Sequence, residues 1–192
     1  MMNRKRKNEV VYIGIGGCGV SILECGIGLL PKGTTCIAID RDGKTLNQVK
    51  HIKHKLPLLK LRITGSHLEY SEQAKEQIQE SIDMQRLRLD LSLKQTGRVV
   101  VMAGIGGVVG SWATLLLCNQ FIEEGKLVDL VLVKPFAFEK ERTELVEYVL
   151  PLFSDKIRQY IFHNDNLTSS SNLSMKESFD NMNQQIFDAL KG

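Results

Sequence analysis

The chain lacks the features of a membrane or secreted protein. No apolar run in its 192 residues reaches the ~18–20 residues that a membrane-spanning helix needs. The start of the chain, residues 1–7, is basic, but Gly14 to Gly19 interrupt the apolar segment that follows, so it does not resemble a signal peptide. We therefore expect no membrane span and a cytoplasmic protein.

Metal-binding patterns and an excess of charge are also lacking. The four cysteines show no paired metal-ligand spacing, and no third ligand lies near His51 and His54. The formal net charge of +3 is too small to indicate nucleic-acid binding. We expect no protein metal site and no nucleic-acid partner.

What the chain does have is a regular alternation of apolar strand-like and helix-like segments. The segments expected as strands are 10–15, 34–39, 56–63, 98–103, 128–133 and 157–162. The segments expected as helices are 20–30, 42–50, 68–93, 110–124, 139–149 and 175–190. This order predicts an α/β fold, a Rossmann-like three-layer sandwich with a mostly parallel sheet. It consists of a basic flexible tail, residues 1–9, and one domain, residues 10–192, that ends in the helix 175–190.

Two glycine-rich turns stand out within this pattern. Residues 14–19 read Gly-Ile-Gly-Gly-Cys-Gly, and residues 104–110 read Gly-Ile-Gly-Gly-Val-Val-Gly. Each follows an apolar strand and precedes a helix. Glycine lets backbone amides crowd an anion, and a helix N-terminus adds partial positive charge. Two such turns predict a ligand with several phosphates, bound from two sides.

Taken alone, the first turn fits a dinucleotide-binding enzyme. Gly14, Gly16 and Gly19 have the spacing of the dinucleotide fingerprint, and Asp40 ends the next strand, where such folds place a carboxylate on the ribose. An oxidoreductase that uses NAD or FAD is therefore one alternative.

Five segments, in order along the chain, resemble motifs of the FtsZ/tubulin family. Residues 13–21 are similar to its first phosphate loop, and 103–111 to its signature Gly-Gly-Gly-Thr-Gly-Thr-Gly. Residues 38–46, Ala-Ile-Asp-Arg-Asp-Gly-Lys-Thr-Leu, are similar to the loop that usually reads Ala-Ile-Asn-Thr-Asp. Residues 133–139, Val-Lys-Pro-Phe-Ala-Phe-Glu, nearly repeat Thr-Lys-Pro-Phe-x-Phe-Glu. Residues 162–167, Phe-His-Asn-Asp-Asn-Leu, resemble Ile-Pro-Asn-Asp-Lys-Leu. The last two have no counterpart in dinucleotide enzymes.

The resemblance implies a domain of the tubulin/FtsZ GTPase type that binds GTP or GDP, with room for a Mg²⁺ ion beside the phosphates. It assigns ribose contact to Glu139, base stacking to Phe179 and a hydrogen bond with the guanine edge to Asn183. Ser21, Asp42 and Arg142 fall at or beside further contact positions. The residues that would surround the phosphates are Gly16, Gly17, Cys18 and Gly19 in the first turn and Gly104, Gly106, Gly107, Gly110 and Ser111 in the second.

The chain also departs from the family pattern. Ser21 replaces an asparagine, and Val108, Val109 and Trp112 stand where the second loop has smaller residues. β-branched side chains resist a positive φ, so we expect a changed loop that grips a third phosphate poorly. A degenerate scaffold that has lost the nucleotide, with Trp112 filling its site, is the second alternative.

In this family, a loop with a catalytic acid and a second domain follow the final helix. This sequence stops within that helix, so we expect a fragment or a short relative that lacks a C-terminal domain. We also expect the helix 175–190 to expose an apolar side. The resemblance implies a prokaryotic cytoskeletal or cell-division protein that associates with itself or with an FtsZ-like partner, and no catalytic residue is assigned in this chain.

Overall fold

The computed structural model describes residues 9–58, 67–93, 96–168 and 173–191. The basic tail apart from residue 9, the predicted strand positions 59–63 and the loop that follows them lie outside these ranges.

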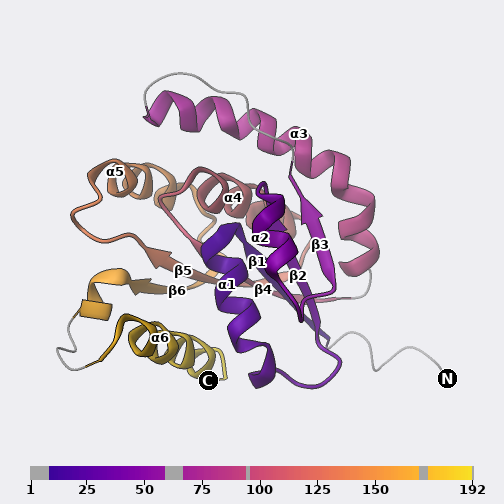
Figure 1. Ribbon diagram of the computed structural model, residues 1–192. Coiled ribbons are helices and arrows are strands. Elements are labelled where there is room, and N and C mark those ends of the chain that lie inside the picture. Colours follow the sequence, from indigo (N-terminus) through magenta and orange to yellow (C-terminus); the bar gives the residue numbers. More distant parts are fainter. Residues whose placement is uncertain (1–8, 59–66, 94–95, 169–172, 192) are drawn as a thin grey trace.

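A sheet of six parallel strands forms the middle of the molecule (Figure 1). Its order is β3-β2-β1-β4-β5-β6. The central strands are rich in buried Val, Ile and Leu because helices cover both of their faces. The strands are β1 Val10–Ile15, β2 Thr35–Asp40, β3 His54–Pro57, β4 Arg98–Gly104, β5 Leu127–Lys134 and β6 Arg158–His163.

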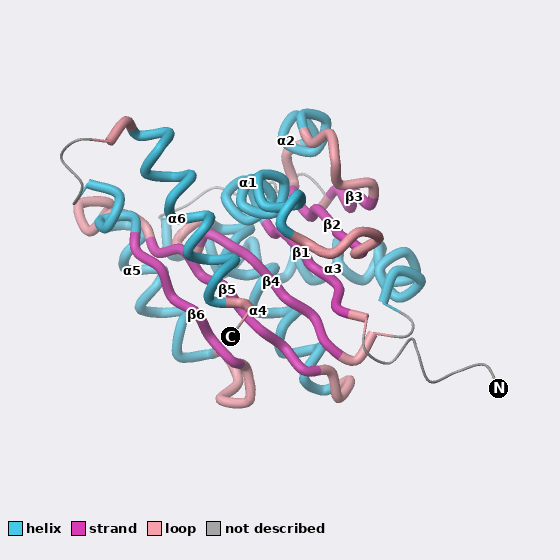
Figure 2. The backbone as a smooth tube through the Cα atoms, turned by 90° about the horizontal axis from the view of Figure 1, so that it is seen from below, coloured by secondary structure: helices cyan, strands magenta, loops and turns pink. Residues whose placement is uncertain are grey.

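Helices cover both faces of the sheet, so the predicted three-layer α/β sandwich is confirmed (Figure 2). Ile13 and Val101 lie in the core under one helix layer, whereas Val100 and Met102 lie in the core under the other. The first layer consists of α3 His67–Leu93, α4 Val108–Glu123 and α5 Lys140–Val149, and the second of α1 Gly16–Gly26, α2 Gly43–Gln48 and α6 Met175–Ala189. Short 3₁₀ helices are η2 Ile27–Leu29, η3 Leu150–Leu152 and η4 Asn164–Thr168.

Two helices start earlier than the sequence predicts. α1 begins at Gly16 rather than at Val20, and α4 begins at Val108 rather than at Gly110. Because glycine has a low helix propensity, the sequence analysis placed both helix starts further along the chain. The first glycine turn therefore forms the first turn of α1, and the second runs directly into α4.

The expectation that α6 exposes an apolar side is wrong. Met182, Ile186 and Phe187 are buried in the second core, and Phe187 is only 2% exposed. The helix packs closely because Gly26 of α1 has no side chain: a Cβ there would lie 1.8 Å from Cε2 of Phe187. Among the large apolar side chains of α6, Met175 and Phe179 stay exposed.

None of the helices in the described ranges combines the length and the apolar composition that crossing a bilayer requires.

Candidate functional site

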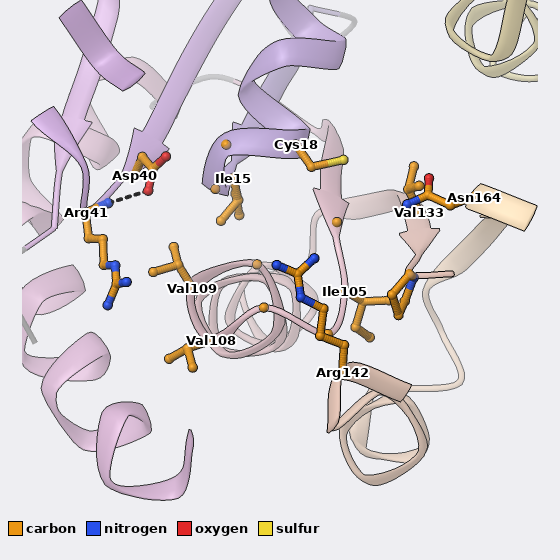
Figure 3. Close-up of a pocket in the computed structure, with 17 residues that line it drawn as sticks. Ile15, Cys18, Asp40, Arg41, Ile105, Val108, Val109, Val133, Arg142 and Asn164 are labelled. Carbon is orange, nitrogen blue, oxygen red and sulfur yellow. Dashed lines mark hydrogen bonds between the residues drawn. The ribbon is translucent and has the colours of Figure 1, made fainter. Parts of the chain in front are cut away.

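A pocket of about 410 Å³ lies at the carboxyl ends of the central strands (Figure 3). The strand order reverses between β1 and β4, and such a switch point is where parallel α/β sheets bind ligands. Both glycine turns reach it, together with the end of β2 and the segments after β5 and β6. The predicted site residues that line it are Gly16, Gly17, Cys18, Gly104, Gly106, Gly107, Gly110 and Arg142.

The first turn presents the open N-terminus of α1 to the pocket. Its N-cap is Ile15, which is extended and provides no side-chain cap, and its first turn contains no acidic residue. Gly16 has φ of +68°, a left-handed conformation that favours glycine. The first N–H groups of a helix have no partner within it, so those of Gly16, Gly17 and Cys18 can bind an anion.

The second turn presents the N-terminus of α4 in the same way. The N-cap is Gly107, without a side-chain cap, and Gly106 has φ of +104°. Ser111 is fully buried, and its Oγ accepts a hydrogen bond of 3.0 Å from the N–H of Gly106. Ser111 therefore stabilises the turn through this hydrogen bond. It does not line the pocket, although the resemblance placed it among the phosphate contacts.

Side chains cap α2 and α6, which begin outside the pocket, whereas the N-cap of α5, Glu139, makes no side-chain cap hydrogen bond. Asp42 caps α2 by accepting a hydrogen bond of 2.9 Å from the N–H of Lys44. Ser174 and Glu177 form a capping box at the start of α6. What distinguishes α1 and α4 is that both of their uncapped ends line the same pocket. Asp42, which does not line the pocket, has a structural role as the cap of α2.

Arg142 is the cation on the α5 side of the pocket. Its Nη1 lies 3.0 Å from Oε1 of Glu139, and Oε2 of Glu139 accepts a hydrogen bond of 3.0 Å from the N–H of Phe136. Glu139 does not line the pocket itself. Its carboxylate binds Arg142 and the N–H of Phe136 in the loop after β5. The ribose contact predicted from the resemblance does not require either of these interactions.

Gly19 and Gly110 serve close packing. A Cβ on Gly19 would lie 2.0 Å from the carbonyl oxygen of Met102, and a Cβ on Gly110 would lie 2.0 Å from that of Gly104. Any side chain would push α1 or α4 off the sheet. Gly19 accordingly lies behind the pocket wall, whereas Gly110 also lines it.

The predicted base-reading residues lie outside this pocket, on α6. Asn183 and Phe179 are one and two turns before Phe187, so the three share a helix face. Because Phe187 packs on Gly26, this face is turned toward α1. Phe179 is 40% exposed, and Ser21 is exposed on α1. The ring of Phe179 therefore stays accessible on a helix face that meets the C-terminal end of α1 at Gly26.

Sequence reasoning missed two polar lining residues, Arg41 and Asn164. Each directly follows the end of a strand, β2 or β6, and each falls within a segment that carried the family resemblance. The carboxyl ends of parallel strands meet at one edge of the sheet. The position of Arg41 and Asn164 directly after a strand could therefore have identified them as site residues.

Comparisons with curated sequences and with solved structures agree with each other. No family model matches the sequence. FtsZ 2 of Methanocaldococcus jannaschii is 26% identical over 193 residues, covering 96% of this chain and 48% of the relative. FtsZ of Aquifex aeolicus is 26% identical over 197 residues, covering 96% and 50%. The chain spans about half the length of the curated relatives it matches.

Solved structures extend this likeness to the fold. TubZ of Clostridium botulinum phage c-st matches with a TM-score of 0.74 and 18% identity, over 97% of this chain and 60% of that one. The FtsZ dimer of M. jannaschii matches with 0.74 and 20%, over 97% and 54%. CetZ2 of Haloferax volcanii, in a GTPγS-bound protofilament, matches with 0.73 and 16%, over 95% and 57%.

The chain has an FtsZ/tubulin-like fold. The resemblance drawn from the sequence motifs is confirmed at this level.

Within this FtsZ/tubulin-like domain, Trp112 does not fill the site. It is 1% exposed and belongs to the core under α3, α4 and α5. Its ring contacts Tyr148 edge-on at 6.1 Å. Val108 and Val109 line the pocket as the first residues of α4, and no non-glycine residue in the described ranges has a positive φ. The helical start accommodates both valines without the backbone strain that the sequence suggested.

The rate at which Cys18 is alkylated can test the geometry of the pocket. Solvent reaches the side chain, but the surrounding walls desolvate it, and this burial raises the pKa of the Cys18 thiol to about 11. Only the thiolate is nucleophilic. At pH 7.5 we expect iodoacetamide to alkylate Cys18 on the order of one hundredth as fast as free cysteine, with a rate that rises until pH is near 11. Peptide mass spectrometry after timed quenching measures this, and a rate equal to that of free cysteine would contradict the site geometry.

No group of three or more His, Cys, Asp or Glu side chains within the described ranges is placed to hold a metal ion.

Proposed function

We propose that this FtsZ/tubulin-like domain binds a guanine nucleotide, GTP or GDP, with its phosphates between the two glycine turns. The observation that carries the proposal is the convergence of two helix N-termini without side-chain caps on one pocket of about 410 Å³. Their amides supply donors for two phosphates, and Arg142 supplies a positive charge.

The base is proposed to lie on α6. Phe179 offers a ring for stacking, and Asn183 offers an amide for the base edge, on the helix face that is turned toward α1. A polar group that must be matched discriminates strongly between ligands. Glycine turns recognise phosphates without regard to the base, so the choice of guanine rests on these two side chains.

The relatives suggest the larger role. The matched sequences are named cell division proteins, and CetZ2 was solved as a GTPγS-bound protofilament. We propose that the protein of which this domain forms part or the whole associates with itself or with an FtsZ-like partner in a prokaryotic cytoskeletal role. We further propose that these 192 residues bind nucleotide without appreciable hydrolysis, because the resemblance assigns the catalytic acid to a loop outside them.

One observation favours a dinucleotide as the second candidate. Asp40, at the end of β2, lines the pocket at the position where dinucleotide folds bind the ribose. NAD therefore belongs in the binding experiment. Trp112, one of the three residues that suggested a degenerate scaffold, lies in the core and not in the pocket, whereas Val108 and Val109 line the pocket.

Isothermal titration of the chain with GTP, GDP, ATP and NAD, each with Mg²⁺, tests the proposal. We expect the guanine nucleotides to bind at least about tenfold more tightly than ATP, the discrimination that a matched polar contact provides. Asn183→Ala should lower this ratio, whereas Gln184→Ala, which removes a neighbouring exposed amide on α6, should leave it unchanged. Guanine nucleotides that bind no better than ATP or NAD would overturn the assignment.

A further inference from the structure

Basic side chains gather around β3, the first strand in the order of the sheet. Two hollows, of about 510 Å³ and about 470 Å³, lie beside this strand and share Lys53 and His54. None of the described residues that line them is acidic. Because the whole chain has a formal net charge of only +3, this grouping is a local feature. The basic lining residues are Lys32, His51, Lys53, His54, Lys55 and Arg88.

These hollows are separate from the phosphate pocket. The first hollow is lined by Thr35 at the start of β2, whereas the phosphate pocket is lined by Asp40 at its end. A strand rises about 3.3 Å per residue, so the two positions are roughly 17 Å apart. The second hollow lies between β3 and the C-terminal half of α3, which runs past β3 (Figure 1). A ligand in these hollows therefore leaves the glycine turns free.

Two carboxylates beside this surface are already engaged. Oε1 of Glu24 lies 2.8 Å from Nδ1 of His51 and accepts a hydrogen bond of 2.8 Å from the N–H of Lys50. On α3, Oδ1 of Asp90 lies 2.8 Å from Nε of Arg86. These carboxylates are thus bound to other partners, and the hollows keep a positive lining.

An apolar stripe on α3 adjoins the second hollow. Leu91 lines the hollow and is 61% exposed. Leu87 and Met84 lie about one and two turns before it on the same helix face, and they are 73% and 69% exposed. A helix face that only meets water is normally polar, and exposed apolar patches mark interaction sites. The neighbouring basic and apolar surfaces fit a ligand that carries both carboxylates and large apolar side chains.

Protection of the sheet edge explains only part of this surface. Lysines on an edge strand hinder its pairing with another sheet, and Lys53 and Lys55 can serve that purpose. This role requires neither Arg88 on α3 nor Lys32 before β2. It also leaves the apolar stripe unexplained.

We propose that the two hollows and the stripe of Met84, Leu87 and Leu91 together dock an acidic amphipathic segment of a partner protein. Carboxylates of the segment lie against Lys53 and Arg88, and its large apolar side chains lie against Leu87 and Leu91. Complementary charge selects the partner and speeds encounter, while burial of the apolar stripe adds affinity. The proposal does not depend on the nucleotide, since no residue of this surface lines the phosphate pocket.

Fluorescence anisotropy of the full chain with three labelled peptides of equal length tests the proposal. The peptides repeat Glu-Glu-Leu, Glu-Glu-Ser and Lys-Lys-Leu. We expect the Glu-Glu-Leu peptide to bind at least about tenfold more tightly than Lys-Lys-Leu, because like charges repel across an interface. It should bind about threefold more tightly than Glu-Glu-Ser, because leucine buries apolar area. Binding of Glu-Glu-Leu no tighter than of either other peptide would overturn the proposal.

Variants locate the binding surface. Lys53→Glu/Arg88→Glu should weaken binding of the Glu-Glu-Leu peptide at least about tenfold, and Leu87→Ala about threefold. All three side chains are exposed, so the fold should persist, as urea unfolding can verify. The affinity for GDP should stay unchanged, which separates this proposal from the proposed function.

Matched controls change the same residue types elsewhere. Lys156→Glu/Lys176→Glu reverses two exposed charges, before β6 and on α6, and Leu173→Ala truncates an exposed leucine before α6. Each should keep the wild-type affinity for the peptide. Losses in these controls equal to those at β3 and α3 would show attraction without a defined surface and overturn the proposal.

Vesicles of phosphatidylglycerol separate a protein segment from a lipid surface. We expect the chain to bind the Glu-Glu-Leu peptide and not to sediment with the vesicles, because the hollows suit a narrow ligand. Sedimentation that depends on Lys53 and Arg88, without binding of the peptide, would assign the surface to a membrane and overturn the proposal.

Discussion

Gly106→Val is expected to lower nucleotide affinity on the order of 100-fold, a loss equivalent to one or two charge-assisted hydrogen bonds. Gly106 has φ of +104°, where a valine is strained. Its Cβ would also lie 2.9 Å from the carbonyl oxygen of Arg142 and 3.2 Å from Cγ of Pro135. The turn and Arg142 must therefore separate, which disturbs amides and guanidinium together. Titration with GDP measures the effect.

Gly125→Val provides the matched control for backbone strain. Gly125 has φ of +75°, but a Cβ there would meet nothing within 4 Å, and it lies before β5, away from the pocket. Both variants should lose stability, as urea unfolding would show, while only Gly106→Val loses affinity. Equal affinity in the two variants would mean that the second turn does not contact the ligand.

Trp112→Ala is expected to lower the free energy of unfolding by about 3–5 kcal/mol, the usual effect of truncating a fully buried aromatic side chain. Trp112 is 1% exposed, contacts the ring of Tyr148, and has Nζ of Lys75 5.2 Å from its ring centroid. Tyr148 is fixed in turn by a hydrogen bond of 2.7 Å from its hydroxyl to Oε1 of Glu72. Because a domain is stable by only about 5–15 kcal/mol, the loss is large.

Urea unfolding followed by circular dichroism measures this loss as a lower midpoint. Trp112→Phe, which keeps a ring in the core, should lose much less. Trp112 is the single tryptophan of the chain, so blue-shifted fluorescence of the wild type checks its burial independently. A loss below about 1 kcal/mol, within the range of surface substitutions, would show that the indole is not in the core.

Five of the six strands could be predicted closely, whereas β3 begins two residues earlier than predicted and the starts of α1 and α4 were missed. Buried parallel strands are short apolar runs bounded by polar or glycine residues, so β1 and β5 were predicted within one residue of their ends. The start of α1 was missed because it contains Gly16 and Gly19. Gly16 takes a positive φ and Gly19 allows close contact with Met102, but the residue type alone reveals neither role.

The site was predictable in its backbone parts and less so in its side chains. The spacing of the glycines locates both turns, because only glycine lets the helix lie this close to the strand. Asp42, Glu139 and Ser111 were expected at the ligand, yet each is engaged by a nearby N–H group or cation. Such local partners depend on rotamers and loop shape, which the order of residue types does not reveal. The burial of α6 likewise depends on Phe187 meeting Gly26.

The pairing of β1 with β4 has a consequence for how the chain folds. Val10 pairs with Arg98 and Ile15 with Ala103, so the centre of the sheet joins segments separated by β2, β3 and three helices. Loop-closure entropy opposes such distant pairing, and folding rates fall as contacts become less local. During synthesis, β1 has only β2 beside it until β4 has left the ribosome. The two glycine turns come together in this late step, and only then does the pocket exist.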